Sequence, residues 1–174
     1  MSITEDSALQ VPIAERIIKL SRETLETPER AIPAYTAWVT AEPAAIAPLV
    51  GLAEVYGLTG QHEYQRDVLD RLVAVTHGTD ATLAFAYARE VAKVCHEKLD
   101  DAEGAYQRLL RGTLSHDEPS RDALHTLALA TGRAATLGDL YAGMAHQQAS
   151  GAAAKAGWLA ARDVYAEHAK DGPK

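Results

Sequence analysis

Arg89, Lys93 and His96 follow one another at spacings of four and three residues. If this stretch is helical, the three side chains share one face, because residues three or four apart are neighbours on a helix. Histidine can act as a general acid or base while arginine holds a phosphate. A guanidinium also offers a planar, bidentate donor fork to a carboxylate. The segment is therefore a candidate both for phosphate chemistry and for binding an anionic partner.

Six residues separate Arg89 from His96, and five separate Arg162 from His168. These spacings are similar to the Arg-x4–6-His motif of small helical ribonucleases, which would imply acid–base catalysis by histidine. The same spacing arises easily on any charged helix. We therefore expect no enzymatic activity and keep a small helical hydrolase or regulatory domain as an alternative.

Other chemistry-bearing patterns point away from metals and cofactors. The seven histidines are spread along the chain without an HExxH context, and Cys95 is the one cysteine, so no CxxC metal site exists. Cys95 itself is interpreted as a small core residue. The glycines at 51, 57 and 60 do not form a phosphate loop after a strand. The sequence predicts no bound metal and no cofactor.

Composition favours an acidic, all-α protein. Alanine occupies 34 of the 174 positions, and alanine is the best helix former and a poor strand former. The formal charge of −7 argues against a general nucleic-acid binder or a protein of anionic membranes. The first ten residues do not resemble a signal peptide, and no run approaches the roughly 18 apolar residues of a membrane span. We expect a cytoplasmic protein.

Apolar periodicity and turn residues predict nine helices and no strand. Pro33 is expected to kink the second helix or delay its start, and Asp80 is expected to cap the fifth. The predicted ranges are 11–26, 28–39, 43–59, 61–76, 80–98, 101–111, 117–131, 133–148 and 152–168.

The chain repeats itself weakly at a period of about 73 residues. Thr59-Gly60 recurs as Thr131-Gly132, and the apolar residues Leu52, Val55 and Val68 recur as Leu124, Leu127 and Leu140. Arg16, Arg89 and Arg162 are spaced by 73 and 73. Such a period holds four helices, and stacked helix pairs bury a continuous core that one pair cannot bury alone.

The repeated segments resemble a degenerate tetratricopeptide repeat. The family's small-residue and glycine pattern is matched by Leu52-Ala53-x-x-Tyr56-x-x-x-Gly60 and by Leu124-His125-x-x-Ala128-x-x-x-Gly132, where a histidine replaces the small residue. The resemblance covers roughly Val11 to His168. It implies a right-handed α-α superhelix of about four helix hairpins plus a C-terminal helix. It also implies one repeat domain over residues 11–169, between flexible ends at 1–10 and 170–174.

The resemblance also implies a binding surface. In this family the first helix of each pair lines a concave groove, and in some members basic residues there hold a peptide carboxylate. By that register the partner-binding residues are expected to be Arg16, Arg89, Lys93, His96 and Arg162. The alternative is that the arginines pair with acids on neighbouring helices, for which Glu54 and Asp122 are available.

The function we expect is a protein–protein interaction scaffold that binds a partner peptide or helix. The alternative from another class is a structural homo-oligomer that uses the alanine-rich helix at 152–168, since small residues allow close helix approach. Trp38 and Trp158 are interpreted as residues packed between helices rather than as partner anchors.

Overall fold

The structure is a computed structural model that describes residues 12–14, 16–17, 27–113, 118–147 and 151–170. All regular structure in these ranges is helical, which confirms the predicted all-α class. Of the helix predicted at 11–26, residues 12–14 and 16–17 are helical and the rest lies outside the described residues. The predicted flexible ends at 1–10 and 170–174 also lie outside them, except for Lys170, which is the last residue of a helix.

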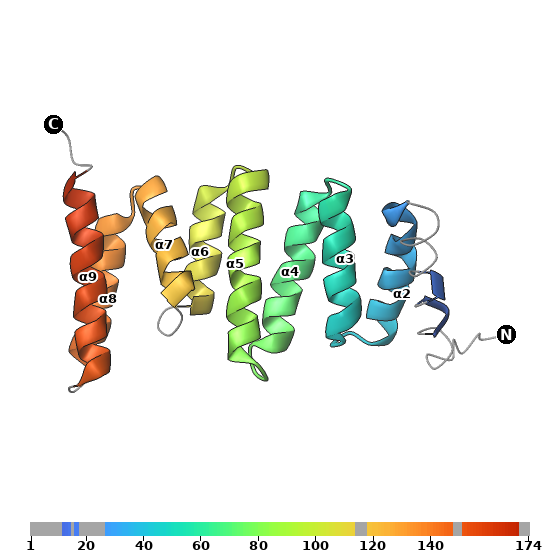
Figure 1. The fold of residues 1–174 in the computed structure, drawn as a ribbon, viewed down its shortest axis with the longest axis horizontal. Coiled ribbons are helices and arrows are strands. Elements are labelled where there is room, and N and C mark those ends of the chain that lie inside the picture. Colours follow the sequence, from blue (N-terminus) through green and yellow to red (C-terminus); the bar gives the residue numbers. More distant parts are fainter. Residues whose placement is uncertain (1–11, 15, 18–26, 114–117, 148–150, 171–174) are drawn as a thin grey trace. The chain divides into compact units, whose positions relative to one another are not determined.

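The chain divides into two compact units, Met1–Asp100 and Asp101–Lys174, and each is described by itself. The first unit contains η1 (Pro28–Ala31), α2 (Ile32–Ala41), α3 (Ile46–Leu58), α4 (His62–Thr76) and α5 (Ala81–Lys98). The second contains α6 (Ala102–Thr113), α7 (Glu118–Ala130), α8 (Ala134–Gln147) and α9 (Ala152–Lys170) (Figure 1). These helices match the predicted ranges to within about three residues.

Two predicted helix starts have the expected local cause. Pro33 lies in the first turn of α2, where its missing N–H costs nothing, and the preceding residues form the separate 3-10 helix η1. The side chain of Asp80 accepts a hydrogen bond from the backbone N–H of Leu83 at 3.0 Å, so Asp80 caps α5 as predicted. Turn and cap chemistry thus determined the helix boundaries.

In the first unit, helices that follow one another along the chain pack against one another, from α2 to α5. The ring of Tyr35 on α2 lies against Gly51 on α3, where a Cβ would overlap the ring. This close approach belongs to a core cluster that also contains Leu52 and Val55. Cys95 is fully buried on α5, as expected for a small core residue.

In the second unit, α9 packs along the length of α8. Gly138 leaves room for the ring of Tyr165, whose hydroxyl donates to Asp139 at 2.6 Å. Near the other end of α8, Gly157 leaves room for Ala145. The last helix therefore packs closely against α8 at both of these glycines.

The turn after α3 explains the first Thr-Gly dipeptide. Gly60 adopts a left-handed φ of 72°, which glycine accepts without a steric cost. The N–H of Gly60 donates to the carbonyl oxygen of Gly57 at 3.3 Å, and the N–H of Gln61 donates to that of Tyr56 at 2.9 Å. The hydroxyl of Thr59 bonds back to the carbonyl oxygen of Val55 at 2.9 Å. The two backbone hydrogen bonds donated by Gly60 and Gln61 form the Schellman motif, which ends many helices.

The turn after α7 repeats that geometry in the second unit. Gly132 has a φ of 68°, and its N–H donates to the carbonyl oxygen of Leu129 at 3.1 Å. The N–H of Arg133 donates to the carbonyl oxygen of Ala128 at 2.7 Å. The sequence repeat of Thr59-Gly60 and Thr131-Gly132 is thus a repeat of local structure. The paired apolar positions agree as well: Leu52, Val55, Leu124 and Leu127 are buried, and Val68 and Leu140 are half-buried.

None of the helices in the described ranges combines the length and the apolar character that crossing a membrane requires.

Candidate functional site

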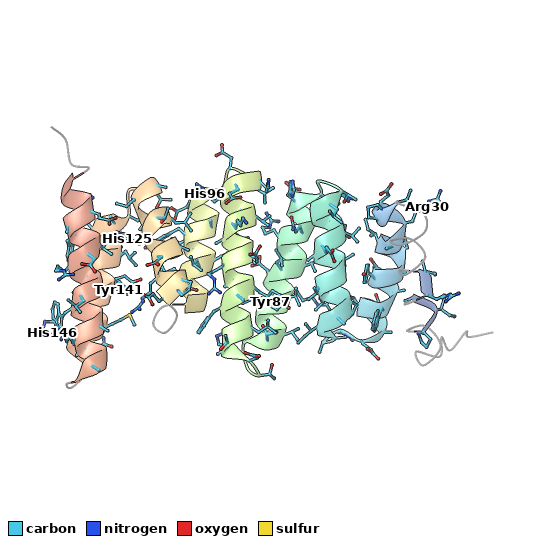
Figure 2. All side chains as sticks on the ribbon, in the orientation of Figure 1. Arg30, Tyr87, His96, His125, Tyr141 and His146 are labelled. Carbon is cyan, nitrogen blue, oxygen red and sulfur yellow. The ribbon has the colours of Figure 1, made fainter. Side chains whose placement is uncertain are left out.

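The second unit contains a pocket of about 260 Å³ between α7 and α9, with α8 beneath it. Figure 2 labels His125 and Tyr141, two of the side chains that line it. The complete lining is Glu118, Arg121, Asp122 and His125 from α7, Tyr141 from α8, and Ala156, Leu159, Ala160, Asp163 and Val164 from α9.

Helical spacing brings these residues to the pocket. On α7, Arg121 and Asp122 lie three and four residues after Glu118 and four and three residues before His125, so the four side chains share one face. On α9 the small residues Ala156 and Ala160 face α7, and Leu159 and Val164 flank them. Large side chains at the two alanine positions would fill the space. The pocket is thus a consequence of small residues on α9 opposite polar residues on α7.

Tyr141 brings a polar atom into this buried environment. Its side chain is 4% exposed, as expected for a core position, yet its hydroxyl has no hydrogen-bond partner among the described residues. Burial raises the pKa of Tyr141 to about 12, and the positive charge of Arg121 opposes the shift. The phenol is therefore neutral at physiological pH and keeps both a donor and an acceptor for a bound group.

His125 lies on the α7 wall with its side chain 19% exposed. Its Nε2 is 3.4 Å from Oε2 of Glu167 but forms no hydrogen bond with it or with any other described group. The repeat already marked this position, because His125 replaces the small residue Ala53 of the first copy. The structure places this substituted position at the wall of the pocket.

The charged groups around the pocket are mostly acidic. Glu118, Asp122 and Asp163 face one guanidinium, that of Arg121. Arg162 holds Asp163 through two hydrogen bonds to Oδ1, from Nε at 2.8 Å and from a terminal nitrogen at 2.5 Å. Within the part of the chain that the structure describes, Glu118 and Asp122 make no ion pair.

The residues predicted to bind a partner fall in both units. Lys93 and His96 are exposed on α5 of the first unit, and Arg89 on the same helix is half-buried and already engaged in a non-covalent interaction. Arg16 is exposed in the short described stretch near the N-terminus. Arg162 is exposed on α9 of the second unit, where it contacts the pocket residue Asp163.

Beside the pocket, α9 exposes apolar side chains. Trp158 is 46% exposed and Leu159 is 41% exposed, and Tyr165 lies further along the helix. The ring of Trp158 meets the edge of His146 at 5.0 Å between centroids. The expectation that Trp158 is packed between helices is therefore wrong in so far as nearly half of the side chain is exposed, while its ring contacts His146 of α8.

Comparison with protein-family models and with curated proteins gave no match for this chain. Among the described residues, no group of three or more histidine, cysteine, aspartate or glutamate side chains is arranged to hold a metal ion. The candidate function therefore rests on the pocket and on the surface around it.

Proposed function

We propose that this chain is a protein–protein interaction scaffold that binds an extended peptide or a helix of a partner. The observation that carries the proposal is the pocket lined by α7 and α9 above Tyr141 of α8. In a tetratricopeptide-like arrangement, these two helices are first helices of successive pairs, and such helices line the binding surface. A pocket lined by the exposed side chain of Leu159 offers a partner both an anchor point and apolar area.

The finer architecture belongs to the same proposal. We propose that the helix hairpins form a right-handed, tetratricopeptide-like superhelix and that the basic face of α5 in the first unit also binds a partner. Lys93 and His96 would make that contact, together with Arg89. The matched Schellman turns after α3 and α7 support this reading, because repeat proteins reuse one local geometry at equivalent positions.

The second candidate is a homo-oligomer formed through α9. The exposed side chains of Trp158, Leu159 and Tyr165 favour it, because exposed aromatic residues are common at interfaces. It predicts that the mass of the particle in solution rises with protein concentration and that Trp158→Ala prevents this rise. A particle that stays monomeric would exclude it.

A peptide-display selection on the immobilised full chain tests the scaffold function. Selected peptides are then synthesised, and their affinity for the chain in solution is measured by calorimetry. We expect dissociation constants below about 1 mM, equivalent to at least about 4 kcal/mol of binding free energy. Failure to enrich any peptide sequence would contradict the proposal.

The same peptides locate the surface. If Arg89→Glu/Lys93→Glu abolishes binding, the peptide contacts α5, and if it does not, the peptide binds elsewhere on the chain. The control is Glu90→Gln/Glu97→Gln, which alters two exposed charges on the same helix.

A further inference from the structure

We infer that the pocket between α7 and α9 receives a lysine or arginine side chain of the partner peptide. This inference rests on the proposed function and specifies the chemistry of the partner. The carboxylates of Glu118 and Asp122, the aliphatic wall of α9 and the hydroxyl of Tyr141 together form a receptor for a cationic head on an aliphatic stem.

The volume of the pocket suits one side chain. Sites for whole small molecules measure about 300–1,000 Å³. The pocket measures about 260 Å³ and is lined on α9 by Leu159, whose side chain is 41% exposed. A long side chain of a peptide lying across α7 and α9 can enter it while the peptide backbone stays outside.

The charges of the lining residues favour a positively charged side chain in the pocket. Three carboxylates face one guanidinium, and the nearby Arg162 neutralises only Asp163. Glu118 and Asp122 remain as acceptors without an ion pair among the described residues. A positively charged side chain would be attracted by both carboxylates, whereas a negatively charged one would be repelled by them. The chain as a whole carries a formal charge of −7, which adds a long-range attraction for basic segments.

The apolar lining fits the stem of such a side chain. Lysine and arginine bury three or four methylene groups along apolar surface while the charged head stays with polar partners. Ala156, Leu159 and Ala160 supply this surface on α9. The carboxylates of Glu118 and Asp122 lie on α7. The aliphatic part of the bound side chain would therefore contact α9, and its charged group would contact α7.

The hydroxyl of Tyr141 is an observation independent of the acidic residues. Tyr141 lines the pocket with a side chain that is 4% exposed, and its hydroxyl is buried without a hydrogen-bond partner among the described residues. A buried polar group without a partner costs free energy, and a guest that bonds to it recovers that cost. Its oxygen can accept a hydrogen bond from an ammonium or guanidinium group.

A titration of the ¹⁵N-labelled full chain tests the inference. The probes are four acetylated and amidated pentapeptides, Ala-Ala-X-Ala-Ala, with X as lysine, arginine, norleucine or glutamate. Norleucine keeps most of the aliphatic stem of lysine and lacks the charge. We expect the lysine or arginine peptide to shift the amide signals of the pocket residues on α7 and α9, and to bind at least about tenfold more tightly than the other two.

The variant Glu118→Gln/Asp122→Asn is expected to bind the lysine peptide at least about tenfold less tightly. Glu90→Gln/Glu97→Gln makes the same change in net charge on α5, and it is expected to bind like the wild type. Circular dichroism confirms that both variants are folded, which is expected because all four side chains are exposed.

Several results would overturn the inference. If the norleucine peptide bound as tightly as the lysine peptide, the pocket would not recognise positive charge. If the glutamate peptide bound more tightly, the pocket would prefer an anion. If n-butylammonium bound as tightly as the lysine peptide, the pocket would be a site for a free amine and not for a side chain of a peptide. Signals that shift with protein concentration instead of peptide would assign it to a second copy of the chain.

The display selection separates this inference from the proposed function. Selected peptides that bind without a preferred basic residue, and without shifting the pocket signals, would refute the inference alone. Failure to select any peptide would refute both.

Discussion

At the residue scale, Tyr141 combines a buried ring with a hydroxyl that has no hydrogen-bond partner among the described residues. Leaving such a group unsatisfied costs about 1–3 kcal/mol, and removing it eliminates the cost. We therefore expect Tyr141→Phe to be more stable than the wild type by about 1 kcal/mol at neutral pH, as measured by urea unfolding. Tyr165→Phe is the control, because its hydroxyl donates to Asp139 and its removal should give no gain. A destabilised Tyr141→Phe would contradict the assignment.

The same residue predicts a pH effect. Burial raises the pKa of Tyr141 to about 12 in the folded chain, whereas the unfolded value is about 10. Between these values the unfolded chain releases the phenol proton and the folded chain does not, so stability falls as the pH rises. We expect the wild type to lose more stability than Tyr141→Phe between pH 10 and pH 12 in urea unfolding. Parallel losses in the two proteins would show that Tyr141 is not the titrating group.

Individual site residues were only partly predictable from the sequence. His125 was visible as a departure from the repeat, whereas Tyr141 was not among the candidate residues. Their meeting at one pocket could not be predicted, because it depends on how α7, α8 and α9 pack. The predicted partner-binding residues were chosen from their spacing and from the register that the family resemblance implies, and that choice stays a prediction: Arg16, Arg89, Lys93, His96 and Arg162.

At the element scale, the two Schellman turns give a matched test. Gly60 and Gly132 have left-handed φ values of 72° and 68°, with open space where a Cβ would be. Alanine there meets backbone strain and no clash, so we expect Gly60→Ala and Gly132→Ala each to lose about 1–2 kcal/mol in urea unfolding. Gly143→Ala is the control, because Gly143 is exposed inside α8 with open space around it. It should gain about 0.5–1 kcal/mol. Equal effects at all three sites would contradict the role of the turns.

Helix positions were predicted well because local signals fix them. The start of α5 at the Asp80 cap and the end of α3 at Gly60 follow from residues next to the boundary. The close packing of α9 on α8 could not be predicted from the sequence, because it depends on Gly138 and Gly157, whose lack of a side chain matters only when the facing residues are known.

At the scale of the whole molecule, we propose that the chain holds a partner peptide at the surface formed by α7 and α9. Composition and repeat pattern predicted an all-α chain, and the structure confirms that class. The partner surface could not be located by pattern, because a pocket arises from residues of three helices. The tetratricopeptide-like superhelix and the scaffold function remain proposals.

The measurement that tests this claim most directly is the affinity of a display-selected peptide for wild type, Leu159→Ala and Leu58→Ala by calorimetry. Leu159 is 41% exposed at the pocket, and Leu58 is 67% exposed on α3 and serves as the control. We predict that Leu159→Ala weakens binding by at least about tenfold, since truncating a central contact costs more than about 1 kcal/mol. Leu58→Ala should bind like the wild type. Unchanged binding by Leu159→Ala would contradict the account.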